Sequence, residues 1–382
     1  MRQYKMVDLG TLIHQAKVVR CGEGNYPVLS MTMHDGLVFQ NDKFKKTIAS
    51  KDKSDYKVVK RNQLVISFPI DEGVLATQRI VDAGIVSPAY GIWDIDQEMI
   101  LPEFLEYALR CDRALNYYKA KLRGSTARRR SLPTSTLLAY TVPLPDISEQ
   151  EHILNVVHKT QKVISGRTEE ISLLDNLIKA RFVEMFGDPN DNPKGYSKKQ
   201  LKDTCRVITG NTPSRAVSEY YGEHIEWIKT DNIVSGLLNP TTATESLSEK
   251  GMAVSRTVES GAILMVCIAG SIASIGRVCV TDRKVSFNQQ INAIVPSDYN
   301  ILFLYVMLQI SKEYLVDEIN MALKGILSKS KLEEKTFYVP PIELQEQFAA
   351  FVEQTDKSKV VVQKALDEAQ TLFDSLMQEY FG

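Results

Sequence analysis

The sequence predicts an α+β fold in which two α/β units are separated by two long antiparallel coiled-coil helices, with approximate two-fold symmetry. Three observations lead to this prediction. Residues 142–150 recur 197 residues later as residues 339–347, without a gap. A long heptad pattern follows each copy, and each pattern ends in Phe-Gly, at 186–187 and at 381–382. A chain of 382 residues with this duplication is expected to behave as a dimer joined in one polypeptide.

The duplication divides the chain into four predicted segments. Residues 1–145 mix strand and helix patterns and form the first α/β unit, and residues 146–187 form a central helix. Residues 188–338 repeat the α/β character and open with a helix-breaking run rich in Pro, Asn and Asp. Residues 339–382 form the C-terminal helix.

The two α/β units also match each other weakly, in the same order along the chain. Leu64-Val65 matches Leu264-Met265 at an offset of 200, and Phe104-Leu105 matches Phe303-Leu304 at an offset of 199. Each match alone is close to chance, but their nearly constant offset supports a duplication of the whole half.

Both helices carry apolar positions at alternating spacings of four and three, which is typical of the a/d seam of a left-handed coiled coil. We expect the two helices to pack against each other, although each could instead pack on its own α/β unit. Polar residues such as Thr160, Thr355 and Lys359 interrupt the seams and can fix their register. The seams correspond at an offset of 195 and comprise Ile153, Val157, Thr160, Ile164, Arg167, Ile171, Leu174, Ile178, Arg181 and Met185, and Phe348, Val352, Thr355, Lys359, Val362, Leu366, Ala369, Phe373, Leu376 and Tyr380.

Composition indicates an ordinary globular protein, with 44% hydrophobic and 24% charged residues and a net charge of −1. The charge is unevenly distributed: residues 1–145 carry 21 Lys and Arg against 15 Asp and Glu, whereas residues 339–382 carry 3 against 8. This distribution favours nucleic acid as a partner of the α/β units and protein as a partner of the helices. No apolar run is long enough for a membrane span, and five cysteines without a C-x-x-C pair indicate free thiols in a reducing cytoplasm.

Cationic and hydroxyl residues gather in loops that suit double-stranded DNA. Lysine and arginine neutralise phosphates, and the arginine fork also binds guanine. Comparable loops lie just before the Pro-rich turn in both halves, although the lysine cluster could also be a solvated loop. The candidate residues are Lys43, Lys45, Lys46, Arg123, Ser125, Arg128, Arg129 and Arg130 in the first unit, and Lys324, Lys329 and Lys331 in the second.

Polar residues in the second unit follow apolar runs that read as strands, so we expect them to lie at the edge of a sheet, where the strands end. Amide side chains can pair with adenine, and arginine with guanine. Two alternatives remain open: the Asn288 segment could be a turn or a buried hydrogen-bonded network, and the Gly270–Arg277 segment could be a tight turn with structural glycines. The candidate DNA-binding residues here are Asn211, Thr212, Ser214, Arg215, Lys229, Thr230, Asn232, Ser271, Arg277, Asn288 and Gln289.

Catalytic motifs are missing from the sequence. It contains no G-x-G-x-x-G, no P-loop and no Asn-Pro-Pro-Tyr stretch, and its five histidines form no metal-binding pair. Glu333-Glu334-Lys335 could suggest a nuclease cluster, but without an upstream Pro-Asp partner a solvated helix face is the better interpretation. We therefore expect no enzymatic activity, no bound metal and no cofactor in this chain.

At the level of motifs the chain resembles the specificity subunits of type I restriction-modification systems. The resemblance rests on the Pro-rich turn, Glu-Gln segment, heptad helix and Phe-Gly of each half, and on four segments of the second unit. These segments are Thr209–Ser214, Glu226–Asn232, Ala269–Arg277 and Phe287–Gln290.

The resemblance implies two target-recognition domains that each read one half of a split DNA site. It also implies a helical spacer that sets the gap and docks two methyltransferase subunits, which restriction subunits join. S-adenosylmethionine, Mg and ATP would then belong to the partner subunits. A different interpretation is a coiled-coil adaptor that joins two proteins without reading DNA. The bases recognised and the spacer length are not predicted.

Overall fold

The computed structural model describes residues 4–33, 35–43, 52–68, 70–122, 132–317, 319 and 325–382. Its contacts divide the chain into two compact units, each of which takes a part of both long helices. Unit 1 comprises Met1–Gly166 and Leu366–Gly382, and unit 2 comprises Arg167–Ala365.

Unit 1 is built around an antiparallel sheet in the order β2-β9-β6-β7. The strands β5 and β8, which flank β6 and β7 in the chain, form a separate antiparallel pair. The strand β1 pairs with β10, which lies just before the long helix. The strands are β1 (Met6–Asp8), β2 (Ile13–Gln15), β3 (Leu29–Thr32), β4 (Gly36–Phe39), β5 (Lys57–Lys60), β6 (Leu64–Ile66), β7 (Leu75–Thr77), β8 (Ala83–Val86), β9 (Gly91–Ile95) and β10 (Thr141–Pro143). The short helices are η1 (Leu9–Thr11), α1 (Gln40–Lys43), η2 (Ile70–Glu72), α2 (Pro102–Arg110), α3 (Asp112–Lys121) and α4 (Thr134–Leu138).

Unit 2 repeats this topology. Its central sheet has the order β12-β20-β16-β18, and β11 pairs with β22 as β1 pairs with β10. Its strands are β11 (Lys198–Gln200), β12 (Cys205–Thr209), β13 (Tyr221–Ile228), β14 (Ser246–Leu247), β15 (Thr257–Val258), β16 (Ile263–Val266), β17 (Ile268–Ala269), β18 (Val278–Val280), β19 (Val285–Phe287), β20 (Ile291–Pro296), β21 (Gly325–Ile326) and β22 (Thr336–Tyr338). Its short helices are α6 (Leu201–Thr204), η4 (Ser218–Tyr220), η5 (Thr230–Asn232), α7 (Glu249–Val254), α8 (Ile301–Ile310), α9 (Lys312–Val316) and α10 (Lys329–Glu334).

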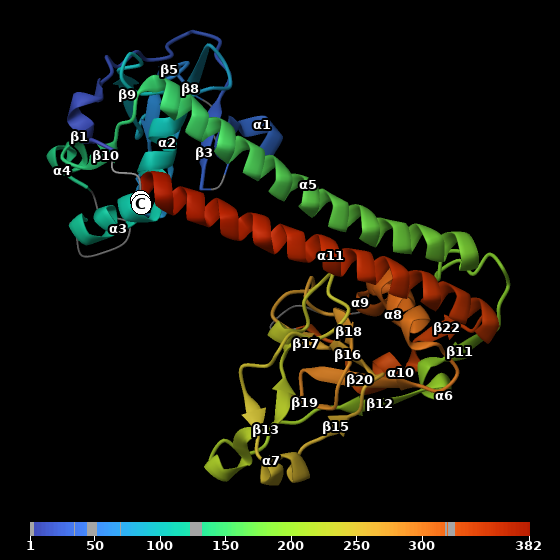
Figure 1. Ribbon diagram of the computed structural model, residues 1–382. Helices are drawn as coiled ribbons and strands as arrows, with labels where there is room; N and C mark the ends of the chain where they lie inside the picture. The colour runs from blue at the N-terminus through green and yellow to red at the C-terminus, as the bar shows by residue number, and fades with distance from the viewer. Residues whose placement is uncertain are drawn as a thin grey trace. The chain divides into compact units, whose positions relative to one another are not determined.

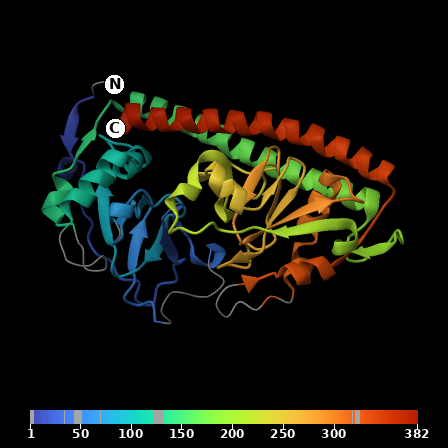
Figure 2. The same cartoon turned by 90° about the horizontal axis from the view of Figure 1, so that it is seen from below.

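The two long helices are α5 (Ile147–Phe186) and α11 (Ile342–Phe381), which run side by side in Figures 1 and 2. In unit 1, Ile153 near the start of α5 shares a buried cluster with Phe381 at the end of α11. In unit 2, Phe186 at the end of α5 lies 5.6 Å, between ring centroids, from Phe348 at the start of α11. Opposite ends of the helices therefore meet in each unit, and the antiparallel arrangement is confirmed.

Buried glutamines correct the alignment of the repeat. Gln150 and Gln345 are both fully buried, and the Oε1 atom of each accepts a hydrogen bond from a backbone N–H at the start of the facing helix, Leu101 in unit 1 and Asn300 in unit 2, at 2.8 Å each. These two glutamines are 195 residues apart, the same offset as the heptad seams. The offset of 197, which paired Gln150 with Gln347, is therefore wrong by two residues because it followed letters rather than buried contacts.

Strand parity corrects a second match. Leu64 lies in the cluster beneath the helices of unit 1, whereas Leu264 lies in the cluster on the opposite face of the unit 2 sheet. Ile263 occupies the helix-facing cluster instead. Since side chains alternate faces along a strand, a shift of one residue exchanges the two faces, and Ile263 is the structural counterpart of Leu64.

Each core joins the sheet to the long helices. In unit 2, α8 is buried from Leu302 to Leu308 and shares one cluster with Phe182 of α5 and Met265 of β16. A short helix that is apolar on all sides has no solvent face, which is why α8 lies inside the unit. All five cysteines are buried and free, as expected. Among the described residues, no helix has both the length and the apolar character that a membrane span requires.

Candidate nucleic-acid interface

Two of the predicted polar segments meet in unit 2. The loop after β12 can lie against the turn after β19 because Gly210 has no side chain: a Cβ there would be 2.2 Å from the Asn288 carbonyl oxygen. Beyond this contact, the exposed Thr212 hydroxyl donates a hydrogen bond to Oε1 of the exposed Gln289. Two segments 77 residues apart therefore present polar side chains together.

A carboxylate joins two of the predicted cations. Glu245 accepts hydrogen bonds of 2.6 Å from both Lys229 Nζ and Arg215 Nη2, and these bonds lower the pKa of its carboxyl group. The Arg215 guanidinium also lies over the rings of Tyr221 and Trp227, at 4.4 and 5.2 Å from their centroids. We call these five residues the Arg215 cluster. Its arginine side chain is 56% exposed, so it is held in place and still open to a phosphate or a guanine edge.

Asn232 and Asn288 are used inside the fold and are only 6% exposed each. The Asn232 amide accepts from the Lys229 backbone N–H at 3.0 Å and donates to the Thr242 carbonyl at 3.2 Å. The Asn288 side chain accepts a hydrogen bond from the Gln290 backbone N–H at 3.0 Å, and its Nδ2 donates to Gln290 Oε1 at 3.2 Å. Both amides therefore hold turns within the fold, as the alternative interpretation of Asn288 expected, and their contact with DNA stays a prediction.

Asn211 and Arg277 also bond to backbone. Asn211 Nδ2 donates to the Val254 carbonyl at 3.0 Å, and its Oδ1 accepts from the Arg256 N–H at 2.8 Å. Arg277 donates to the carbonyls of Thr230 and Ser274 at 3.0 and 3.3 Å. Asn211 thus ties the loop after β12 to the end of α7, and Arg277 ties two further loops together.

The remaining predicted residues that the structure describes are distributed over several surface segments. Ser214 and Ser271 are exposed in loops, and the exposed Lys329 and Lys331 lie in α10, with Lys329 Nζ 3.5 Å from Glu333. The other predictions lie outside the described residues: Lys45, Lys46, Arg123, Ser125, Arg128, Arg129, Arg130, Lys324 and the side chain of Lys43.

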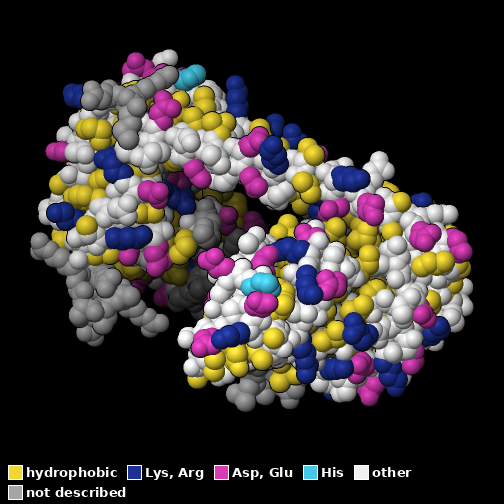
Figure 3. All heavy atoms as spheres, turned by 60° about the horizontal axis from the view of Figure 1, so that its bottom comes forward, with side chains coloured by type: hydrophobic (Ala, Val, Ile, Leu, Met, Phe, Trp, Pro, Cys, Tyr) yellow, Lys and Arg dark blue, Asp and Glu magenta, His cyan; other side chains and the backbone are white. Residues whose placement is uncertain are grey.

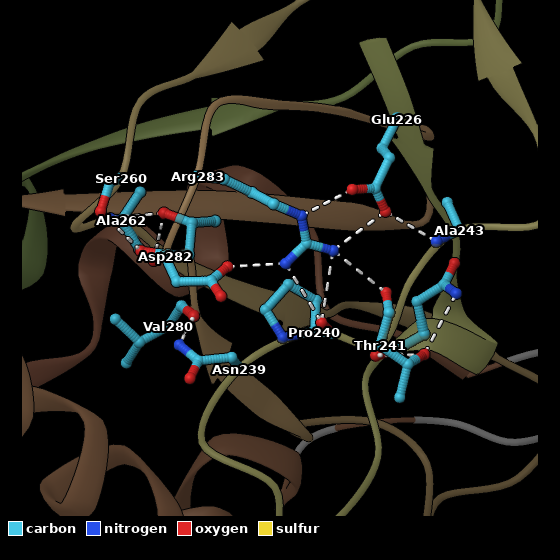
Figure 4. Close-up of polar contacts among 12 residues, drawn as sticks. Glu226, Asn239, Pro240, Thr241, Ala243, Ser260, Ala262, Val280, Asp282 and Arg283 are labelled. Atoms are coloured by element: carbon cyan, nitrogen blue, oxygen red, sulfur yellow. Dashed lines mark hydrogen bonds and ion pairs between the residues drawn. The ribbon is translucent and has the colours of Figure 1, made fainter. Parts of the chain in front are cut away.

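The sequence pattern did not predict a second charged group in unit 2, in which Arg283 binds the carboxylates of Glu226 and Asp282 (Figure 4). We call it the Arg283 clamp. Arg283 donates to both carboxylate oxygens of Glu226, at 2.6 and 2.9 Å, and to Asp282 at 2.6 Å. Glu226 in turn accepts from the Ala243 N–H at 2.7 Å, and its bonds to Arg283 hold its pKa below the usual carboxyl range. Because Glu226 precedes Trp227 in β13 and Ala243 lies two residues before Glu245, the Arg283 clamp ties β13 to the segment that carries Glu245. Glu226 and Arg283 are 57 residues apart, and no local pattern links them.

Surface charge on the face drawn in Figure 3 is mixed, with Lys and Arg side chains interspersed among Asp and Glu. This agrees with the balance of 17 basic and 17 acidic residues between positions 188 and 338. No broad field of one sign covers this face, so any binding of a charged ligand there would depend on local groups of side chains.

Known proteins resemble this chain along most of its length. Residues 193–369 match the family model described as type I restriction modification DNA specificity domain. Over these residues the chain is similar to the specificity subunits of type I restriction-modification systems. It is 22% identical over 328 residues to the HindI specificity subunit of Haemophilus influenzae, an alignment that covers 66% of this chain and 70% of that protein.

A second similar protein is the MjaIX specificity subunit of Methanocaldococcus jannaschii, which is 24% identical over 74% of this chain and 69% of that protein. The crystal structure of a type I restriction-modification S subunit from M. genitalium covers all of this chain and 96% of its own, with a TM-score of 0.59 and 14% identity. At this identity the structural likeness supports the fold, in agreement with the predicted architecture.

Proposed function

We propose that this chain is a type I specificity subunit that reads a bipartite DNA site, with the α/β body of each unit contacting one half. The observation that carries the proposal is the repeated architecture: both units have the same central strand order and the same buried glutamine at the start of a long helix. Two related reading bodies suit two separate half-sites, since recognition of a split sequence depends on how far apart the readers are held.

In unit 2 the Arg215 cluster is the best candidate for direct contact with DNA. It offers one exposed guanidinium and one ammonium against a single carboxylate. Neutral donors and acceptors are added by Ser214, which is adjacent to Arg215 in the chain, and by the hydrogen-bonded pair Thr212 and Gln289. Arginine forks and amides are the side chains that read base edges, and hydroxyls contact phosphates.

We assign the helix pair to methyltransferase docking and to setting the gap between half-sites. Aliphatic side chains remain exposed on both helices, including Leu173 of α5 at 59% and Val361 of α11 at 69%. Exposed apolar residues on a helix favour a protein partner. Two methyltransferase subunits would bring S-adenosylmethionine, and restriction subunits would bring ATP and Mg, so that this chain supplies recognition rather than catalysis.

Methylation mapping tests the proposal. The chain is purified with its methyltransferase partner and incubated with S-adenosylmethionine and genomic DNA, and the modified adenines are sequenced. We expect one split, non-palindromic motif with a fixed gap. Methylation at a contiguous palindrome, or at no defined sequence, would contradict it.

Paired variants then assign a half-site to unit 2. R215Q with K229Q should relax or abolish recognition of one half and leave the other half unchanged. K250Q is the matched control, because Lys250 is also an exposed cation of unit 2 paired with an acid, Glu219. Equal loss at both halves would remove the Arg215 cluster from base recognition.

The adaptor alternative makes the opposite prediction for salt. A DNA reader releases counterions, so its affinity for duplex falls steeply as salt rises, whereas contacts through apolar helix faces persist. Duplex binding that is absent at low salt, with partner binding intact, would favour the adaptor.

A further inference from the structure

A polar cavity in unit 2 lies apart from the Arg215 cluster. It has a volume of about 240 Å³ and is bounded by α5, α8 and α11 and by the loops that hold Gly236 and Gly276. Its floor is apolar and includes Ile178, Leu238 and Val352. Six charged residues line it: Asp175, Lys179, Arg277, Lys312, Asp356 and Lys359.

One of the two carboxylates that line the cavity is paired with a lysine. Lys359 Nζ lies 2.6 Å from Asp175 Oδ1 and donates a second bond of 2.8 Å to the Gly236 carbonyl, so this lysine and Asp175 neutralise each other. Asp356 is half-buried, and burial raises its pKa against the opposing effect of Lys359. The lining holds four cations against two carboxylates, so an anion that entered the cavity would meet a net positive charge.

Two of the cations that line the cavity, Arg277 and Lys312, donate hydrogen bonds to backbone carbonyl groups. Arg277 donates to Thr230 and Ser274, and Lys312 Nζ lies 2.5 Å from the Ala273 oxygen. Within the described part of the chain, neither cation forms an ion pair with a carboxylate. Burial and the nearby Arg277 charge lower the pKa of Lys312. Like charges placed together without a counterion are destabilising, and a bound anion relieves this cost.

We propose that this cavity, the Arg277–Lys312 pocket, binds a phosphoryl group. The guanidinium fork and the ammonium supply charged donors, and the lining Ser235 and Gln309 offer neutral ones. The phosphoryl group comes either from a small free phosphate compound or from the DNA backbone. The same pocket is lined by both long helices and by the loops that hold Gly236 and Gly276, so its occupant would stabilise the packing of these loops on the helices.

Hydrogen exchange of the full-length chain tests the pocket with inorganic phosphate as the probe. Sodium phosphate is compared with sodium chloride at equal ionic strength. We expect phosphate to slow exchange in peptides covering residues 230–238 and 270–277, in a saturable manner. R277Q and K312Q should each weaken this response about tenfold or more, since each removes a charged donor.

Three controls keep the result interpretable. K312R retains the charge and should retain binding, which separates charge loss from misfolding. K250Q removes an exposed cation elsewhere in unit 2 and should leave phosphate binding unchanged. A nonspecific DNA duplex forms the second arm of the experiment, measured on the same peptides.

The arms distinguish the two sources. Protection by phosphate that R277Q and K312Q abolish supports a site for free phosphate compounds. Protection by duplex alone, with the same dependence on both residues, supports the site and assigns it to the DNA backbone. Equal exchange in phosphate, chloride and duplex, or protection that neither variant affects, overturns the inference. Bipartite methylation would stand in that case, because the proposed function does not depend on the pocket.

Discussion

Replacing Gln150 by leucine separates a structural role of the duplicated glutamine from a role in recognition. The Gln150 side chain is fully buried, and its Oε1 accepts from the Leu101 N–H at 2.8 Å. Its Nε2 donates to the carbonyls of Met99 and Pro145 at 3.0 and 2.9 Å. Leucine has a similar size and cannot form these bonds, so three backbone groups lose their partner. At about 1 kcal/mol for each unpaired group, unit 1 should lose about 3 kcal/mol of stability.

Hydrogen exchange measured by mass spectrometry can resolve this loss by unit. A loss of about 3 kcal/mol corresponds to roughly a hundredfold faster exchange where amides open with the unit. In Q150L the acceleration should appear in peptides of α2 and be absent from those of α8. In Q345L the pattern should reverse, with a smaller loss of about 2 kcal/mol, since Gln345 bonds to the Asn300 N–H and the Pro340 carbonyl.

The control is E151Q, which changes an exposed neighbour on the same helix and should leave exchange unchanged in both units. Acceleration of less than about fivefold in Q150L would mean that water or backbone shifts satisfy the three groups. Equal acceleration in both units would refute the assignment of one glutamine to each unit.

Three further variants test other parts of unit 2. K359M leaves Asp175 without its ammonium and should cost about 2 kcal/mol in urea unfolding, of which the double variant with D175N recovers a part; no recovery would contradict a charge effect. Glu226 has a pKa held below its unfolded value by Arg283, so its stabilisation is present above the usual carboxyl range and is lost as pH falls through the lowered pKa. E226Q should therefore be less stable than wild type near pH 7, with a smaller difference near about pH 3, and a pH-independent difference would refute this. G210A places a methyl group 2.2 Å from the Asn288 oxygen and should destabilise unit 2 by more than about 2 kcal/mol, measured by thermal unfolding; a neutral effect would show that the loop moves freely.

The linear pattern of the chain determined the long helices, their apolar faces and the presence of two related bodies. Heptad spacing is a local property, so Ile153 and Phe348 could be assigned to a buried seam from the sequence alone. Duplication likewise indicates that both halves share a topology, which the strand orders confirm. The buried aromatics Phe182 and Phe186 lie outside the predicted seam, because they pack on the α8 side of the helix.

Tertiary structure alone decided which polar residues are open to a ligand. Asn232 and Thr212 both stand in polar runs that follow apolar residues, yet the first is buried in a turn and the second is exposed. Arg215 and Glu245 are 30 residues apart, and the cavity beside Lys312 gathers residues from both long helices. The physical reason is that hydrogen bonds and ion pairs depend on distances of a few ångströms, which are set when strands and helices remote in sequence pack together. A periodic pattern specifies the face of one element, but it contains no information about which other element will lie opposite that face.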